Sequence, residues 1–410
     1  MFSIISSISW EIPLALLLLG LMGFRISITP RTSVWVRATP DKVFNVLDIV
    51  DGKSSEYGRT KILHELVDAA TQTYRHTYTT TIMGGTARSF SALFRVSNRI
   101  PGKKLTMIRE GLEGKSKSSE LLEITHELSD EDGGTRFKTA YHWGPRPLLA
   151  QITARSDLWG GSLRMKSLIE TGIANETPYN LIAAAVALVT GIITLATFAL
   201  FLGLNGSLLV IVVLFIHEFG HLLAYRLIGQ PWGRMLFLPF LGAVAIPRLP
   251  FESQAHAVFA ALMGPGLSTV FAMLCALILY ASGQLDPLYL RLGLIFVLIN
   301  LFNLLPVEPL DGGIALRSVL TRIMGSFARF GLLAVGAATI ACGLYFSQII
   351  FVIFGGIAIL ANLKVRKIDA DMTPLTSLQT TIAGFAYIAM ATAYVTMWQY
   401  FVSHVPATLI

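Results

Sequence analysis

The chain has few charged residues and almost no cysteine. Of its 410 residues, 14% are charged and 53% are hydrophobic, whereas a water-soluble protein of average composition carries about 25% charged residues. The two cysteines, Cys275 and Cys342, lie in apolar runs, so neither a disulfide framework nor a thiolate metal site is predicted. The composition excludes a disordered chain, a collagen-like chain and a simple soluble enzyme.

Several common functional motifs are also missing. The sequence contains no P-loop, no GxGxxG and no GxSxG, the motifs of phosphate binding, dinucleotide binding and serine hydrolases. The net charge of +7 is compatible with a nucleic-acid partner, but basic residues also flank the cytoplasmic ends of membrane spans. We therefore predict no nucleic-acid partner.

The charges that do occur are concentrated in one region. Residues 25–178 hold 22 of the 32 Lys and Arg residues and 17 of the 25 Asp and Glu residues. The remainder of the chain is strongly apolar. This distribution indicates a soluble domain joined to a membrane domain.

The apolar part contains about eight candidate membrane spans, because about 20 apolar residues in a helix cross the hydrocarbon core. They are residues 10–24, 179–204, 207–228, 255–282, 288–305, 329–346, 348–363 and 380–402. The first lacks a basic leader and a signal cleavage site, so we interpret it as an uncleaved membrane anchor.

The distribution of Lys and Arg predicts the orientation. If the N-terminus lies outside and the spans alternate, the outer segments contain no Lys or Arg, and only Arg291 falls near an outer end. Lys364, Arg366 and Lys367 then fall on the inner side. The positive-inside rule thus predicts that both termini lie outside and that residues 25–178 lie in the cytoplasm. We expect the membrane to be the cell (inner) membrane.

The third span carries the pattern His217-Glu218-Phe219-Gly220-His221. At 3.6 residues per turn, His217 and His221 leave one face of the helix and can bind one metal ion. Glu218 lies beside them and is placed to take a proton from a water molecule that Zn²⁺ activates. Ionisable residues within a membrane span are costly and usually functional, so we predict a zinc site.

A third protein ligand is needed to complete such a site. Glu308 and Asp311 both emerge on the inner side, close in depth to His221, in a segment that contains Pro306, Pro309 and two glycines. The prolines prevent a regular helix there, and a carboxylate can fold back toward the metal. The residues alone do not decide between Glu308 and Asp311.

Together these motifs resemble the site-2 protease family of intramembrane zinc metalloproteases, which pairs HExxH with a downstream N-x-x-P-x-x-P-L-D-G segment. The second motif runs here from Asn303 to Gly312. The resemblance implies that Asp311 is the third zinc ligand, that Glu218 is the general base and acid, and that Asn303 binds the substrate.

The resemblance extends to two further segments. Gly264-Pro265-Gly-Leu-Ser268 is similar to the family's GPxxN segment, with Ser268 in place of Asn, so no role follows for Ser268. Residues 235–246 correspond to a β-hairpin in the family, whose edge pairs with an unwound substrate. His256 lies near a helix start, where a single histidine is usually a cap or an interface residue.

The pattern of the soluble region predicts an α+β domain. Strand-like runs occur at 33–37, 73–82, 88–98, 105–111, 119–128 and 135–143, a helix start at Thr39-Pro40-Asp41, and a long helix over 147–174 that Gly160-Gly161 interrupts. This order resembles the START-like (helix-grip), polyketide-cyclase-like fold, which often encloses an apolar cavity. The histidines of this region are scattered and suggest no chemistry; they are His64, His76, His126 and His142.

We therefore expect a multi-pass α-helical membrane protein with an N-terminal soluble START-like domain. Its parts would be an anchor (1–29), the cytoplasmic START-like domain (30–178), a catalytic membrane core (179–325) and C-terminal spans (326–410). The predicted function is intramembrane zinc metalloendopeptidase, acting on membrane-protein substrates within the lipid bilayer and regulated by a lipid or other apolar ligand. The alternative is a non-catalytic lipid-binding membrane protein with a relict zinc site.

Overall fold

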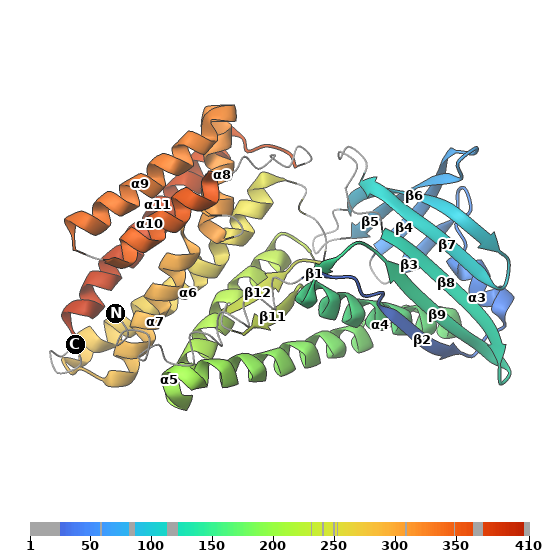
Figure 1. Ribbon diagram of the computed structural model, residues 1–410, viewed down its shortest axis with the longest axis horizontal. Coiled ribbons are helices and arrows are strands. Elements are labelled where there is room, and N and C mark those ends of the chain that lie inside the picture. The colour runs from blue at the N-terminus through green and yellow to red at the C-terminus, as the bar shows by residue number, and fades with distance from the viewer. Residues whose placement is uncertain are drawn as a thin grey trace, which may run out of the picture. The chain divides into compact units, whose positions relative to one another are not determined.

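The structure, a computed structural model, describes most of the chain. The described residues are 25–57, 60–81, 87–112, 122–230, 232–239, 242–248, 251, 253–307, 310–347, 349–363 and 372–405. The chain divides into two compact units, Met1–Leu188 and Val189–Ile410. Figure 1 labels the elements of both units.

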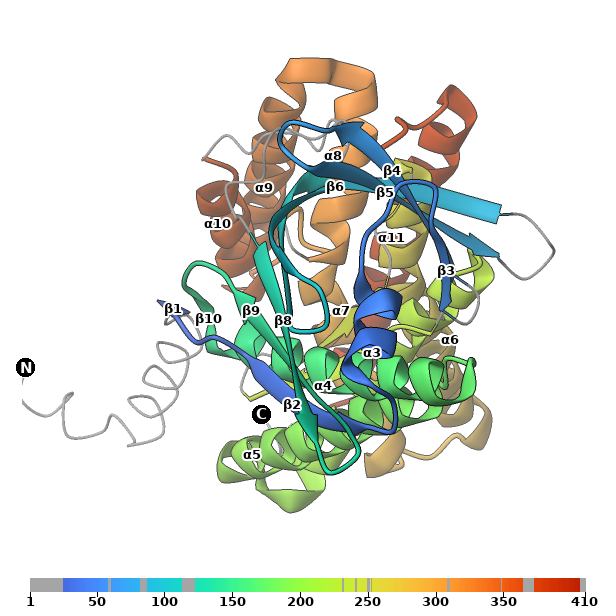
Figure 2. The same cartoon turned by 90° about the vertical axis from the view of Figure 1, so that its right-hand side faces the viewer.

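The first unit is built on one antiparallel sheet of eight strands in the order β2-β9-β8-β7-β6-β5-β4-β3. The sheet curls strongly (Figure 2). Its strands are β2 (Arg31–Val36), β3 (Ser54–Tyr57), β4 (Thr60–Asp68), β5 (Thr73–Thr81), β6 (Ala87–Ile100), β7 (Lys104–Leu112), β8 (Leu122–Glu131) and β9 (Gly134–His142). A separate pair joins β1 (Arg25–Ile26) to β10 (Arg146–Pro147).

Two helices complete this unit. The helix α3 (Pro40–Leu47) begins as predicted, with Pro40 at its first position and the Thr39 side chain accepting a hydrogen bond from the Lys42 N–H. The long helix α4 (Leu148–Thr171) buries Ile169 in the core of the sheet. An antiparallel sheet with a long C-terminal helix confirms the predicted helix-grip-like architecture.

The structure differs from the prediction in two details. The strands β3 and β4 were not predicted, because the side chains of β4 do not alternate between apolar and polar; pairing with β3 and β5 makes this segment a strand. The helix α4 is continuous through Gly160, where an interruption was predicted. A Cβ at Gly160 would lie 2.6 Å from the Tyr179 ring, so this glycine serves packing and not a helix break.

Two of the scattered histidines lie side by side. His64 of β4 and His76 of β5 are direct cross-strand partners, their ring centroids are 4.4 Å apart, and the His76 ring stacks on Phe94. Both are buried, and burial lowers the pKa of His64 to about 4 and that of His76 to about 3. Both rings are therefore neutral at pH 7.

This pair predicts that the first unit loses stability in acid. Between about pH 6.5 and pH 4 these histidines bind protons in the unfolded chain but not in the folded one. The free energy of unfolding therefore falls as the pH falls, by up to about 1.4 kcal/mol per histidine per pH unit. Urea unfolding of a fragment of residues 30–174, followed by tryptophan fluorescence, should show the loss. His76→Phe should lose less stability between pH 7 and pH 5; an unchanged pH dependence would contradict this explanation.

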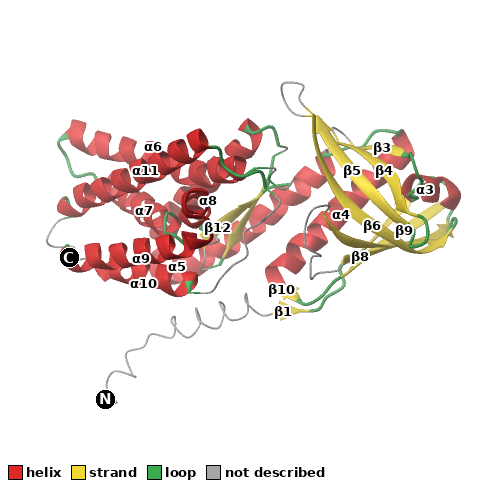
Figure 3. Cartoon of the chain, turned by 90° about the horizontal axis from the view of Figure 1, so that it is seen from above, coloured by secondary structure: helices red, strands yellow, loops and turns green. Residues whose placement is uncertain are grey.

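The described residues of the second unit form mainly helices, together with one hairpin. A long helix, α5 (Thr177–Leu227), crosses the boundary between the units and leads into β11 (Arg234–Leu238) and β12 (Gly242–Ile246), which pair antiparallel. The remaining helices are visible in Figure 3. They are α6 (Gln254–Ser282), α7 (Pro287–Asn303), α8 (Asp311–Met324), α9 (Ala328–Tyr345), α10 (Ile349–Asn362) and α11 (Ser377–Ser403), with a short 3-10 turn, η1 (Gly325–Phe327), between α8 and α9.

Four described helical stretches are long and apolar enough to cross a membrane, and this supports membrane association. They are Thr177–Leu227, Gln254–Ser282, Asp311–Tyr345 and Ser377–Ser403. The predicted count of about eight is not supported. The predicted spans 179–204 and 207–228 are two helical stretches joined by a kink at Gly203 (φ 65°, ψ 172°) within α5. The helices α7 and α10, with 17 and 14 residues, are shorter than these stretches. Residues 10–24 lie outside the described part of the chain.

Residues of α5, α6, α7, α8 and α11 share one apolar core in this unit. Tyr394 of α11 lies fully within it and donates a hydrogen bond to the Pro265 carbonyl at 2.7 Å. Proline at position 265 interrupts the hydrogen bonding of α6, and Thr269 also donates to the Pro265 carbonyl. The core thus holds the part of α6 around Pro265 in place.

Candidate metal centre

One turn of α5 carries three buried polar side chains. His217, Glu218 and His221 are 2%, 4% and 7% exposed, and their ligand atoms lie within 4.8 Å of one another. The helix places the two histidines on one face, as their spacing predicts, so that their Nε2 atoms are 3.2 Å apart. Polar groups this deeply buried need partners.

The partners of the two rings define which nitrogen faces inward. His217 Nδ1 lies 2.8 Å from Asn300 Oδ1, and His221 Nδ1 lies 2.7 Å from the Ala260 carbonyl oxygen. Because each partner atom is an acceptor, each Nδ1 carries the proton and donates it, an assignment made from the hydrogen bonds. Each Nε2 of a neutral ring therefore presents a lone pair to the same point.

Asn300 was not singled out from the sequence. It is fully buried on α7, and its side-chain N–H donates to the Phe296 carbonyl at 2.7 Å, which orients Oδ1 toward His217. Such a partner fixes the tautomer and the orientation of a metal-binding imidazole. The available signal was a polar residue inside an apolar helix, which indicates function within a membrane span.

Asp311, the first residue of α8, brings a carboxylate to the same point. Its Oδ2 lies 3.2 Å from His217 Nε2 and 3.5 Å from His221 Nε2, and no described residue donates a hydrogen bond to it. Two nitrogen lone pairs and a carboxylate oxygen repel one another unless a cation lies between them. The donor set therefore fits a metal ion.

A tight turn between α7 and α8 makes this position possible. The Val307 N–H donates to the Leu305 carbonyl and the Leu310 N–H donates to the Val307 carbonyl, at 2.7 and 2.8 Å. A Cβ at Gly312 would overlap the Leu304 backbone, so the turn requires glycine there. Glu308, the other candidate ligand, lies outside the described residues.

Close contact between α5 and α6 brings the His221 side chain against the backbone of α6. A Cβ at Gly220 would lie 2.9 Å from the Gly264 Cα, and a Cβ at Gly264 would overlap the His221 imidazole. Two glycines therefore let the helix backbones meet.

One turn further along α6, Ser268 is fully buried, and no described residue forms a hydrogen bond with its Oγ. His256 lies in the first turn of α6, where its N–H donates to Ser253.

The hairpin contacts the same face of α5 through Ala245. The Ala245 N–H donates to the Glu218 carboxylate, and the Ala245 carbonyl accepts a hydrogen bond from Tyr225 Oη at 3.1 Å. Both backbone groups of this β12 residue therefore face α5. The hairpin holds Glu218 beside the metal-binding histidines.

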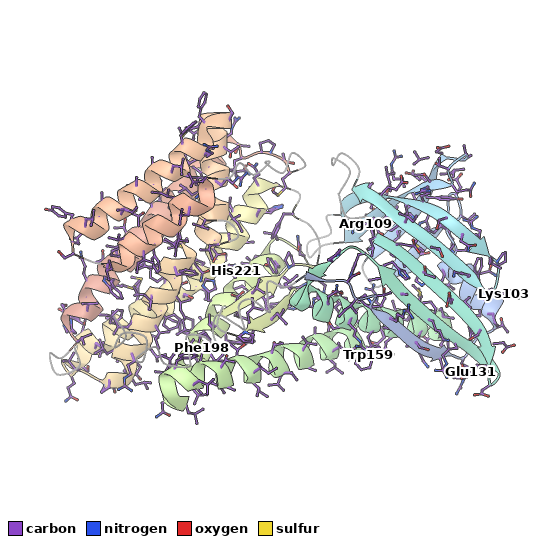
Figure 4. All side chains as sticks on the ribbon, viewed as in Figure 1. Lys103, Arg109, Glu131, Trp159, Phe198 and His221 are labelled. Atoms are coloured by element: carbon purple, nitrogen blue, oxygen red, sulfur yellow. The ribbon has the colours of Figure 1, made fainter. Side chains whose placement is uncertain are left out.

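A cavity of about 1380 Å³ opens onto the metal centre. Its wall includes His217, Glu218, His221 and Asp311, together with Asn303 of α7. Asn303 donates a hydrogen bond to the Ile299 carbonyl at 3.1 Å, so its side-chain amide is held in the cavity wall. Figure 4 labels His221 on α5, close to this site. The five site residues predicted from the sequence thus line one cavity.

Comparisons with known proteins identify a metalloprotease relative. No family model matches the chain. A zinc metalloprotease from Methanocaldococcus jannaschii is 29% identical over 124 residues, which make up 29% of this chain and 35% of that protein. The similarity to a zinc metalloprotease predicted from the motifs is thus confirmed, over a match that spans about a third of the relative.

Solved structures are similar to part of the chain at low identity. A protein from Chromobacterium violaceum is 16% identical, with a TM-score of 0.27, and the match covers 35% of this chain and 96% of that one. A protein from Arthrobacter aurescens is 10% identical, with a TM-score of 0.28, and the match covers 38% of this chain and 95% of that one.

The geometry makes a prediction about metal binding. Asp311→Ala and His217→Ala should each bind metal at least about tenfold more weakly, because each removes one donor atom and loss even of a supporting partner typically costs 10–100-fold. Metal content of the purified protein, measured by mass spectrometry after dialysis, tests this. Glu308→Ala is the matched control; if it loses metal while Asp311→Ala retains it, Glu308 is the ligand.

Proposed function

We propose that the protein is an intramembrane zinc metalloendopeptidase of the site-2 protease type. It cleaves transmembrane segments of other membrane proteins near the cytoplasmic side. The observation that carries this proposal is the convergence of His217 Nε2, His221 Nε2 and Asp311 Oδ2 beside Glu218 in a cavity of an apolar helical unit. The named relative supports a metalloprotease.

The donor distances fit a zinc ion. The two Nε2 atoms are 3.2 Å apart, and Asp311 Oδ2 lies 3.2 Å from His217 Nε2 and 3.5 Å from His221 Nε2. Two nitrogens and an oxygen at about 2.0–2.2 Å from a tetrahedral zinc ion lie about 3.3–3.5 Å apart. Two histidines and one carboxylate are also the protein ligands of many catalytic zinc sites, in which the fourth position stays open.

Glu218 carries the proton transfers in this mechanism. When bound, zinc polarises the scissile carbonyl and lowers the pKa of water to about 7. Glu218 accepts a proton as the water oxygen attacks the carbonyl carbon, and it then delivers the proton to the amide nitrogen as the C–N bond breaks. Asn303, held in the cavity wall, orients the substrate carbonyl through its side-chain amide.

The hairpin provides a binding edge for an extended substrate. Residues two apart in a strand turn their backbone groups the same way, so Ala243 directs its N–H and C=O toward the same side as Ala245, and both residues line the cavity. A substrate segment that unwinds can add as a strand at this edge. Unwinding is required because a helix shields its peptide bonds.

The mechanism predicts that Glu218→Gln retains the metal but loses cleavage. The substitution removes the base and leaves all three metal ligands, and general acid–base catalysis contributes typically 10²–10⁴-fold. Membrane proteomes of cells carrying wild type and Glu218→Gln should differ by uncut substrates that accumulate in the mutant. Metal content is the control; wild-type cleavage by Glu218→Gln would refute the mechanism.

We also propose that the protein is a multi-pass protein of the cell (inner) membrane, with residues 25–178 and the active site toward the cytoplasm. In a background with both native cysteines replaced, a cysteine at position 206 or 405 should react with an impermeant thiol reagent in intact cells. A cysteine at position 131 should react only after lysis. The opposite pattern would reverse the orientation.

A final part of the proposal is that the helix-grip unit binds a lipid or other apolar ligand and so regulates cleavage. A ligand changes activity only if it binds the active and inactive arrangements with different affinity. Native mass spectrometry of the fragment 30–174, before and after exposure to membrane extract, should show a bound apolar molecule that denaturation releases. A fragment that takes up nothing is better explained as a docking domain.

A further inference from the structure

The cavity has a second polar end, away from the metal centre. Asn205 of α5 and Arg291 of α7 both line it, as do the catalytic residues. Figure 4 labels Phe198 and His221 on α5, and both residues belong to the cavity wall. The cavity is therefore an elongated space along α5 and α7, with the metal centre near one end.

The length of this space follows from the two helices. Asn205 precedes His217 by the same number of residues, twelve, as Arg291 precedes Asn303. Both stretches are helical, and the turn of α5 at Gly203 lies before them. At 1.5 Å per residue, each pair is about 18 Å apart, so the two polar ends are separated by about 18 Å.

The wall between the two ends is apolar. It is lined mainly by aliphatic side chains, among them Val210, Leu214, Ile295 and Leu298. A groove with such a wall takes an apolar chain segment.

The cation at the far end has no counter-charge in the part of the chain that the structure describes. Arg291 is exposed there, and no described carboxylate pairs with it. The nearby Asp286 caps α7 instead, since its side chain accepts a hydrogen bond from the Leu288 N–H at 2.8 Å. A guanidinium at the mouth of an apolar groove favours an anionic partner and disfavours a cationic one.

We infer that Arg291, with Asn205, recognises an acidic side chain that flanks the apolar segment of the substrate. This inference rests on the proposed function and names its substrate class: membrane segments with Asp or Glu about 18 Å from the scissile bond. That distance corresponds to about five or six extended residues or about twelve helical residues. Arg291 thereby selects the substrate and sets the position of the cut.

The test measures binding of defined peptides to the full-length protein in nanodiscs of phosphatidylcholine, which has no net charge. The probes are fluorescent Leu/Ala peptides of about 20 apolar residues that end in Asp-Asp, Ser-Ser or Lys-Lys. Wild type should bind the Asp-Asp peptide about tenfold more tightly than the Lys-Lys peptide, a difference of about 1.4 kcal/mol. Arg291→Glu should reverse this preference.

Arg322→Glu is the matched control, because Arg322 is an exposed arginine of α8 that does not line the cavity; it should keep the wild-type preference. The inference is overturned if wild type binds none of the peptides or shows no preference, or if Arg291→Glu keeps the wild-type preference. Cleavage of the bound peptide is scored separately. A preference without cleavage contradicts only the protease assignment, whereas cleavage without preference contradicts only the role of Arg291.

Discussion

The second unit depends on bringing three metal-binding atoms together in an apolar interior. Two imidazole nitrogens and a carboxylate oxygen lie 3.2–3.5 Å apart, where each would be costly to bury without a partner. Two features of the structure offset this cost. Asn300 and the Ala260 carbonyl occupy the outer ring nitrogens, and the inner atoms are left to a cation.

Backbone contacts, more than side-chain contacts, make this arrangement possible. Gly220 and Gly264 let α5 and α6 approach until His221 reaches the carbonyl of Ala260, and Gly312 lets the turn before α8 close on Leu304. A methyl group at any of these three positions would push a helix away. The prolines of the turn prevent α7 from continuing. The glycines that follow let α8 begin close to the end of α7.

The first unit shows where sequence patterns succeed and fail. The start of α3 follows from local chemistry and was predicted. The turn at Asp132-Gly133, where both residues have positive φ, also follows from local chemistry. The strand β4 was missed because its side chains do not alternate, so only its neighbours in the sheet determine it. For the same reason His64 and His76 appeared scattered, although the sheet register makes them direct partners.

The sequence by itself determined the division into a charged and an apolar region, the helical spacing of His217 and His221, and the presence of a carboxylate after a proline-rich turn. These features depend on composition and on contacts within a few residues. Only the tertiary structure decided that Asn300 orients His217, that Ala245 holds Glu218, and that Arg291 lies in the same cavity as the metal centre. The first two pairs are 83 and 27 residues apart in the chain, and Arg291 is 74 residues from His217. Only packing of helices and a hairpin brings such distant residues together.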